Sequence, residues 1–230
     1  NNIEARSYTN VAFATIPWAR AFLRSLASSH IGVIAEEEKL RWSGVSTLLP
    51  SEVLLNPDGI VLPWSHLQTS FSKSMIESVY GGEDIFIRPD SPWKPFTGFT
   101  TTQDDFDYNI NSYSQLEKIS ANELAVICPA KPVGSTEWRF WMMEGEVITF
   151  APYSWDEDAQ LPEECPENVW DLAQSLTSRA VEIDPWLVVD IVESGGTAKV
   201  CEMNGFSTSG MYAGADMVKI IRKMQKSLKM

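Results

Sequence analysis

The segment from Trp186 to Asn204 constrains the fold of this chain more than any other. Two apolar runs, WLVVDIV and AKVCEMN, are separated by the short sequence ESGGT. Apolar runs that flank a pair of glycines are typical of two antiparallel strands joined by a tight turn. A β-hairpin at this position determines which side chains of the two runs face each other.

Three polar side chains interrupt this otherwise apolar hairpin. Asp190 lies inside the first run, and Glu202 and Asn204 lie two residues apart near the end of the second. Alternate residues of a strand point to the same face, so Glu202 and Asn204 share one. A carboxylate buried in a strand without a partner is costly, so Asp190 requires a cation or a hydrogen-bond donor nearby.

The length of the turn decides whether Asp190 joins this pair. A turn of the two glycines alone pairs Asp190 with Cys201, whereas a three-residue turn of two glycines and a threonine pairs Asp190 with Glu202. We favour the three-residue turn, because it also sets Glu193 opposite Lys199 and cross-strand pairs of opposite charge are stabilising. Three-residue hairpin turns that contain glycine are common.

In the favoured register, Asp190, Glu202 and Asn204 lie on one face. Oxygen ligands without histidine or cysteine suit a hard cation, and Mg²⁺ is typically held by one or two carboxylates together with phosphate oxygens. The alternative is that Asp190 pairs with a core arginine such as Arg139 and that no metal binds. The residue spacing favours neither interpretation over the other.

The composition narrows the class of protein. The chain has 230 residues and a formal net charge of −13, which disfavours nucleic acid as a partner because phosphate backbones are repelled. No apolar run approaches the roughly 20 residues that a membrane span requires. The three cysteines form no CxxC pair, which favours a reducing compartment, and we therefore expect a cytoplasmic protein.

Several familiar kinds of active site are disfavoured. The two histidines, His30 and His66, lie in the first third of the chain, away from the polar hairpin. A zinc site built on histidine and a Ser–His–Asp triad are therefore improbable. Neither a Walker A sequence nor a G-x-G-x-x-G sequence occurs, which disfavours the P-loop and Rossmann folds.

Hydrophobic periodicity predicts a mixture of helices and strands. Apolar residues at helical spacing indicate helices over 17–29, 72–80, 169–183 and about 213–228. The apolar stripe of the last helix is expected to consist of Met217, Ile220, Ile221 and Met224. Short apolar runs indicate strands over 31–37, 59–64, 84–88, 96–102 and 124–130. A further hairpin is expected over 137–153, with Glu144 and Gly145 in its turn.

Basic side chains occur close to several of these strands. Arg88 ends the strand over 84–88, and Lys94 lies in the loop that follows. An arginine that emerges from an apolar strand requires an anion. Lys131 follows the strand over 124–130, and Arg139 faces the same way as Glu137 in the next hairpin. Each alone is more often a salt-bridge partner, but together with the acidic hairpin they suit a nucleoside triphosphate and its metal.

The order of these features resembles the ATP-grasp superfamily. The stretches IFIRPDSPWKPFTGF, EWRFWMMEGEVI, LVVDIV and KVCEMNGFSTSGMYA resemble more closely a small clade, often found in phages and bacteria, that is known for an arginine and two lysines. The similarity covers roughly residues 70–220. The E-x-N sequence and the RPDS…K…TG sequence are fairly specific together and weak apart.

The resemblance implies an α+β fold in which two α/β lobes hold ATP between them. On this basis residues 1–70 are expected to form a short α/β lead-in, and residues 71–230 the ATP-grasp domain. Within that domain, residues 71–130 are expected to form the smaller lobe and residues 131–230 the larger one.

The resemblance also implies a set of roles for individual residues. Adenine is expected to lie against Ile127, Cys128 and Pro129, bound to their backbone, and the phosphates to contact Arg88 and Lys94. Lys131 and Glu137 are expected to contact the nucleotide, and Arg139 to stabilise the transferring phosphoryl group. One or two Mg²⁺ ions are expected on Asp190, Glu202 and Asn204. The residues counted as catalytic are Arg88, Lys94 and Arg139.

The activity that the resemblance implies is an ATP- and Mg²⁺-dependent carboxylate–amine ligase. Such enzymes convert a carboxylate into an acyl-phosphate, which an amine then attacks, and the substrates here would be a peptide, a protein or a small amino compound. Phosphoryl transfer requires charge neutralisation and alignment rather than a histidine nucleophile, so the residue types fit. The alternatives are a nucleotide-binding interaction protein with reduced catalysis and a phosphotransferase that uses the same pocket.

Overall fold

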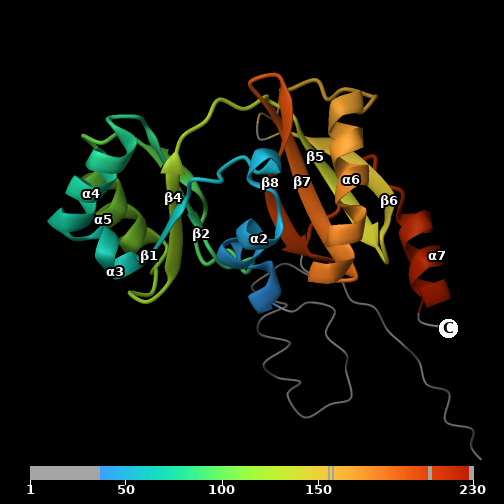
Figure 1. Ribbon diagram of the computed structural model, residues 1–230, viewed down its shortest axis with the longest axis horizontal. Coiled ribbons are helices and arrows are strands. Elements are labelled where there is room, and N and C mark those ends of the chain that lie inside the picture. The colour runs from blue at the N-terminus through green and yellow to red at the C-terminus, as the bar shows by residue number, and fades with distance from the viewer. Residues whose placement is uncertain (1–36, 155, 157, 207–208, 228–230) are drawn as a thin grey trace, which may run out of the picture.

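The computed structural model describes residues 37–227 apart from 155, 157, 207 and 208. It contains two four-stranded antiparallel sheets that lie side by side as two lobes, each with helices packed against its sheet (Figure 1). The predicted α+β fold of two lobes is confirmed. The helix expected over 17–29, His30 and the strand expected over 31–37 lie outside the described residues, except for Glu37. Among the described helices, none has the length and apolar character needed to cross a membrane.

The smaller lobe is a sheet with the strand order β1-β4-β2-β3. Its strands are β1 (Ile60–Pro63), β2 (Ile85–Pro89), β3 (Phe99–Thr101) and β4 (Leu124–Pro129). The helices α3 (Trp64–Leu67), α4 (Ser70–Tyr80) and α5 (Phe106–Leu116) cover its outer face (Figure 1). Ile85, Ile87 and Ile127 pack into the core beneath these helices. Because side chains alternate along a strand, Arg88 in β2 points to the opposite face, toward the larger lobe.

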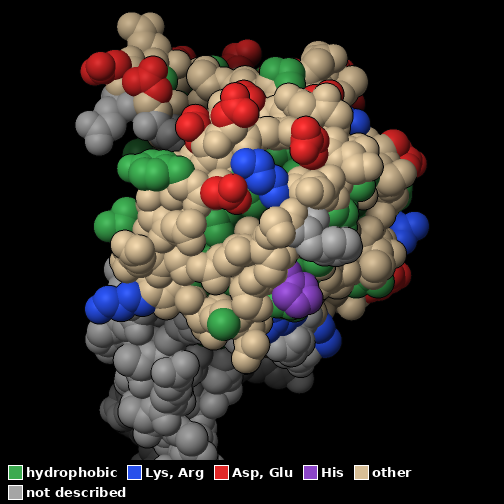
Figure 2. Space-filling model, turned by 90° about the vertical axis from the view of Figure 1, so that its left-hand side faces the viewer, with side chains coloured by type: hydrophobic (Ala, Val, Ile, Leu, Met, Phe, Trp, Pro, Cys, Tyr) green, Lys and Arg blue, Asp and Glu red, His purple; other side chains and the backbone are tan. Residues whose placement is uncertain are grey.

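The outer surface of the smaller lobe is shown in Figure 2. Acidic side chains gather toward the upper part of this face, whereas basic side chains stand apart from one another. The ends of α4 explain its position beneath this surface. Thr69 caps the N-terminus by accepting a hydrogen bond from the amide of Ser72, and Gly81 ends the helix in the left-handed conformation.

The larger lobe has the strand order β6-β5-β7-β8. Its elements are β5 (Glu137–Met143), β6 (Glu146–Tyr153), α6 (Glu167–Ile183), β7 (Trp186–Ser194), β8 (Thr197–Gly205) and α7 (Met217–Ser227). The hairpin of β5 and β6 turns at Glu144 and Gly145 as predicted, and both have positive φ. α6 packs on one face of the sheet, with Trp138 and Phe140, and α7 packs on the other, with Trp141.

The predicted three-residue turn between β7 and β8 is wrong. Glu193 lies opposite Ala198 rather than Lys199, so the turn contains only Gly195 and Gly196. Their φ angles are 57° and 77°. Two glycines in the left-handed region form the tight turn that matches the twist of the strands, and this outweighs one weak charge pair across the ladder.

Asp190 nevertheless pairs with Glu202, as predicted. The register of β7 and β8 shifts between the pair Ile191–Val200 and the pair Asp190–Glu202, so Cys201 is an extra residue in β8. This β-bulge adds back the residue that the shorter turn removes. Asp190, Glu202 and Asn204 therefore share one face of the sheet, for a different reason from the one that the sequence indicated.

The segment before β1 joins the two lobes. The 3₁₀ helices η1 (Glu37–Leu40) and η2 (Ser51–Val53) flank α2 (Trp42–Leu48). Trp42 and Val45 of α2 pack into the same core as Val200 and Met203 of β8, and the chain then enters the smaller lobe at β1. The sheet that contains β1 thus crosses the expected boundary at residue 70, and the division into a lead-in and a domain stays a prediction.

The last helix is shorter than expected and buries a narrower stripe. α7 starts at Met217, and Ile220 and Met224 are buried against the sheet. Ile221, which was expected in the apolar stripe, is 46% exposed, so this part of the prediction is wrong. Residues four apart share a helix face, whereas Ile221 is turned about 100° from Ile220 and lies outside the contact with the sheet.

Candidate functional site

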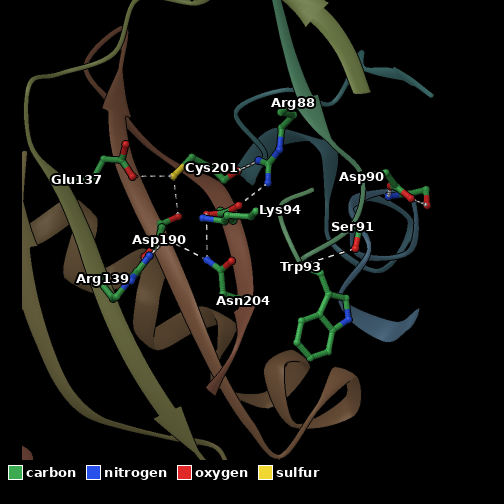
Figure 3. A network of polar contacts seen from close by, with 12 residues as sticks. Arg88, Asp90, Ser91, Trp93, Lys94, Glu137, Arg139, Asp190, Cys201 and Asn204 are labelled. Carbon is green, nitrogen blue, oxygen red and sulfur yellow. Dashed lines mark hydrogen bonds and ion pairs between the residues drawn. The ribbon is translucent and has the colours of Figure 1, made fainter. Parts of the chain in front are cut away.

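Two cations of the smaller lobe meet one carboxylate of the larger lobe (Figure 3). Arg88, at the end of β2, donates through Nη2 to Glu202 Oε1 at 2.8 Å and through Nη1 to the carbonyl of Cys201. Lys94, in the loop after β2, donates through Nζ to Glu202 Oε2 at 2.7 Å. Both oxygens of the Glu202 carboxylate are therefore paired with a cation from the other lobe.

Arg139 and Asp190 form a buried ion pair in the larger lobe. Arg139 Nε and Nη2 each lie 2.7 Å from one oxygen of Asp190, whose residue is fully buried. The alternative interpretation of Asp190, a pair with Arg139, is thus present in the structure. Burial acts to lower the pKa of Arg139, but the hydrogen bonds and charge of Asp190 raise it above its ordinary value. Burial raises the pKa of Asp190 against the lowering effect of Arg139.

Aromatic rings and one carbonyl hold the outer side of Arg139. Its guanidinium carbon lies 5.3 Å from the ring centroid of Tyr153 and 4.7 Å from that of Tyr212. The two rings are stacked at 4.3 Å. Arg139 Nη1 also donates to the carbonyl of Gly210 at 3.2 Å. These contacts fix the plane of the guanidinium, because cation–π geometry and paired hydrogen bonds both orient it.

Asn204 connects the two carboxylates. Its Nδ2 donates to Asp190 Oδ2 at 3.1 Å and to Glu202 Oε2 at 3.0 Å. The structure therefore brings together the three side chains that were predicted as metal ligands. In the part of the chain that the structure describes, no three His, Cys, Asp or Glu side chains form a metal site by themselves. Two carboxylates and an amide instead suit a hard cation whose remaining ligands are phosphate and water.

Glu137 lies beside this group, at the start of β5. The hydroxyl of Tyr153 donates to Glu137 Oε2, and the thiol of Cys201 contacts the same oxygen at 3.7 Å. Cys201 also reaches the carbonyl of Asp190, at 3.3 Å. Cys201 thus faces the site, although the sequence suggested a thiol packed inside a strand. The β-bulge turns it to this face, and no sequence signal marks a bulge of this kind.

The residues expected around the adenine lie further along β4. Ile127 is fully buried and pairs with Ile60 on one side and with Ile87 on the other. Cys128 is also buried, and burial raises the pKa of its thiol to about 12. Lys131 pairs with Asp58 at 2.9 Å rather than with Glu202. The roles of Ile127, Cys128 and Lys131 toward a nucleotide stay predictions.

Glu202 should make the stability of the fold depend on pH. Burial acts to raise its pKa, but Arg88, Lys94 and Asn204 outweigh this effect and lower the pKa to about 2 from an ordinary value of 4.5. A carboxyl with a lowered folded-state pKa stabilises the fold above its unfolded-state pKa, and the contribution disappears as the pH falls from about 4.5 through about 2. We expect a loss on the order of 2–3 kcal/mol across this window.

Denaturant unfolding at several pH values between 2 and 5 measures this effect against a Glu202→Gln variant. The variant has no carboxyl at this position, so its stability should fall less steeply than that of the unaltered chain. The difference between the two should shrink toward pH 2. Parallel curves for the two proteins would contradict the strong pairing of Glu202 with Arg88 and Lys94.

Two antiparallel lobes, with arginine and lysine of one lobe facing carboxylates of the other, define a fold of the ATP-grasp class. A family model for the ATP-grasp domain, family 3 of one ATP-grasp clade, matches residues 37–224. The chain therefore belongs to this family, and the resemblance noted in the sequence is confirmed. Which of its arginines and lysines mark the clade stays a prediction. None of the curated proteins matches the sequence.

Solved structures share the fold at low sequence identity. D-cycloserine synthetase DcsG has a TM-score of 0.66 at 14% identity, over 97% of this chain and 84% of that chain. The ATP-grasp ligase PsnB has a TM-score of 0.55 at 13% identity, over 83% of this chain and 61% of that chain. D-alanine–D-alanine ligase from Bacillus anthracis has a TM-score of 0.52 at 14% identity, over 82% and 58%.

The extent of this likeness limits what it establishes. The chain spans about three fifths of the length of PsnB and of the D-alanine–D-alanine ligase. At these identities the likeness shows the fold alone, because one fold can host many activities.

Proposed function

We propose that this protein is an ATP- and Mg²⁺-dependent carboxylate–amine ligase that acts through an acyl-phosphate. One observation carries the proposal. On a fold of the ATP-grasp family, the cations of Arg88, Lys94 and Arg139 and the oxygen ligands of the β7–β8 hairpin meet within one hydrogen-bonded group. Such a set can neutralise and align a triphosphate, which is most of what phosphoryl transfer requires.

The proposed nucleotide site lies between the two lobes. Arg88 and Lys94 would bind phosphate oxygens, because both are held at the point where the smaller lobe meets β8. Glu137 and Lys131 would contact the nucleotide further out, and adenine would lie against the chain at Ile127–Cys128–Pro129. The D-alanine–D-alanine ligase was solved in complex with ATP, and a PsnB structure contains Mg and ADP.

Asp190, Glu202 and Asn204 would hold Mg²⁺ together with the phosphates. The metal would supply positive charge that stabilises the charge developing on the transferred phosphoryl group. In the described contacts, Glu202 binds Arg88 and Lys94 through both of its oxygens. Arg88 and Lys94 would therefore exchange Glu202 for phosphate when the metal takes their place on the carboxylate.

The bond-forming steps follow from this arrangement. A substrate carboxylate oxygen would attack the terminal phosphorus of ATP and release ADP, and Arg139 would stabilise the phosphoryl group as it moves. An amine would then attack the acyl carbon, phosphate would leave, and the amine would lose a proton. PsnB was solved with a precursor peptide and DcsG is D-cycloserine synthetase, so the proposed substrates range from a peptide or protein to a small amino compound.

A thermal-shift measurement tests the nucleotide part of the proposal. ATP with Mg²⁺ at about a hundredfold above its Kd should raise the melting temperature by roughly 5–10 °C. A Lys94→Ala variant should lose most of this shift. A Lys73→Ala variant should keep it, because Lys73 pairs with Asp107 on the surface of the smaller lobe. No shift in the unaltered chain with any nucleotide would contradict the proposal.

Release of ADP in the presence of carboxylates and amines then separates the candidate activities. A ligase should release ADP only when a carboxylate is present, and an amide product should appear when the amine is added. A stable phosphorylated product without an amide would indicate a phosphotransferase. Nucleotide binding without ADP release from any substrate would indicate an interaction protein.

We also propose the cytoplasm as the compartment. Cys128, Cys165 and Cys201 are all free thiols. Unpaired cysteines are typical of proteins that work in a reducing environment.

A further inference from the structure

We infer that Asp90 is a positioning residue that sets where Arg88 and Lys94 present their charges, an inference that rests on the proposed function. Asp90 lies immediately after β2, two residues beyond Arg88 and four before Lys94. Its side chain points away from Glu202 toward the start of α2, as Figure 3 shows. Its described contacts are with α2 and β4 rather than with the carboxylates of the site, so any effect on a nucleotide must pass through its neighbours.

The carboxylate of Asp90 holds the N-terminus of α2. The side chain of Asp90 is fully buried. Its Oδ1 accepts the amide hydrogen of Ser43 at 2.7 Å, and its Oδ2 accepts the Ser43 hydroxyl at 3.1 Å. Arg41 Nη1 lies 3.4 Å from Oδ2. The residue at the N-cap of α2, Arg41, provides no side-chain cap, so Asp90 supplies the cap from another part of the chain.

The backbone of Asp90 is fixed by the same elements. Its carbonyl accepts the amide hydrogen of Trp42 at 2.9 Å, and its own amide donates to the carbonyl of Leu124 in β4 at 2.9 Å. The guanidinium carbon of Arg88 lies 5.4 Å from the centroid of the Trp42 ring. The start of α2 therefore contacts both Asp90 and Arg88.

Lys94 depends on the anchoring of this loop. Its φ angle is +45°, in the left-handed region that residues other than glycine seldom adopt. Such a conformation persists only when the surrounding structure enforces it. The amide of Lys94 donates to the carbonyl of Ser91 at 3.2 Å, next to Asp90, and Phe96 is buried against Trp64 on the other side. Asp90 and Phe96 are thus the two anchors between which Lys94 is held.

The contacts of Asp90 also connect the two lobes. α2 belongs to the core of the larger lobe, where Trp42 and Val45 pack with Val200 of β8, whereas Asp90 belongs to the smaller lobe. The bond between Asp90 and Ser43 therefore fixes the loop of the smaller lobe relative to the strand that carries Glu202. A group placed in this way sets the distance between the phosphate-binding cations and the metal ligands.

Isothermal titration of MgATP into an Asp90→Asn variant tests the inference. Asparagine keeps the volume but loses the charge and one acceptor, so Kd should rise about tenfold, since small displacements of binding groups are costly. Titration well below each melting temperature excludes unfolding as the cause. The matched control is Thr69→Ala, which removes the cap of α4 in the same lobe and should leave Kd within about twofold. Ser43→Ala, which removes only the hydroxyl contact, should raise Kd about threefold.

A double-mutant cycle shows whether Asp90 acts through Lys94. In a Lys94→Met background, Asp90→Asn should change Kd by less than about twofold, because the group that Asp90 positions is gone. Equal effects of Asp90→Asn in both backgrounds would show a general structural role and overturn the inference, as would an unchanged Kd in Asp90→Asn and Ser43→Ala. An unaltered chain that binds no MgATP would contradict the proposed function instead, and the positioning role would fall with it.

Discussion

Replacing Arg139 with methionine should lower the free energy of unfolding by about 3–5 kcal/mol. The change leaves Asp190 fully buried without the two hydrogen bonds of 2.7 Å that it accepts from Arg139. Asn204 would remain as a neutral donor at 3.1 Å. Burial and the charges of Glu202 and Glu137 raise the pKa of Asp190, so without Arg139 we expect this carboxyl to take up a proton at neutral pH.

Denaturant unfolding of three proteins measures this effect. An Arg139→Met, Asp190→Leu double variant removes both charges and should recover most of the lost stability, because a buried ion pair is often no more stabilising than apolar residues of similar size. Arg179→Met, which changes an exposed arginine that contacts the carbonyl of Leu48, should cost less than about 1 kcal/mol. A single Arg139→Met variant as stable as the unaltered chain would show that Asp190 does not depend on Arg139.

The second large effect is expected from Glu202→Ala, which should reduce ADP release at least about a hundredfold while the protein stays folded. The variant removes one proposed metal ligand and, at the same time, the counter-ion of Arg88 and Lys94. Both cations then become available to phosphate without a metal. ATP should therefore bind to the variant about equally well with and without Mg²⁺, whereas the unaltered chain should require Mg²⁺ for tight binding.

A matched control lies in the same hairpin. Glu193→Ala removes a carboxylate of β7 that contacts Asn168 on the exposed side, and it should change neither turnover nor the effect of Mg²⁺. Turnover at the unaltered rate in Glu202→Ala would remove Glu202 from the proposed metal site. A lost turnover with an unchanged Mg²⁺ dependence of ATP binding would instead assign Glu202 to the alignment of Arg88 and Lys94 alone.

Local features of the site could be predicted from the sequence. The spacing of Glu202 and Asn204 placed them on one face because strand geometry has a period of two, and the apolar strand before Arg88 indicated that this arginine requires an anion. Glu202 is that anion in the structure. The partner of Asp190 was left open between a metal and Arg139, because the spacing along one strand does not determine what the neighbouring strand presents.

Features that depend on distant contacts could not be predicted. The pairing of Asp190 with Glu202 was correct only because a bulge at Cys201 compensates for a shorter turn, and periodicity contains no signal for a single extra residue. Asp90 reads as an ordinary loop residue beside prolines. Its role depends on Ser43, which is 47 residues away in sequence, and on a burial that only the packed lobes create.

The path of the chain through α2 also has a consequence for the order in which the protein becomes functional. The first described helix docks on β8, and the ammonium of Lys199 in β8 reaches the carbonyl of Glu52, 147 residues earlier. At a synthesis rate of about 5–20 residues per second, these partners leave the ribosome roughly 7–30 s apart. Such long-range contacts form late in folding because closing a long loop is entropically costly. The smaller lobe is therefore complete in sequence well before α2 has a surface on which to dock, and the loop that carries Lys94 acquires its working geometry only when one of the last strands arrives.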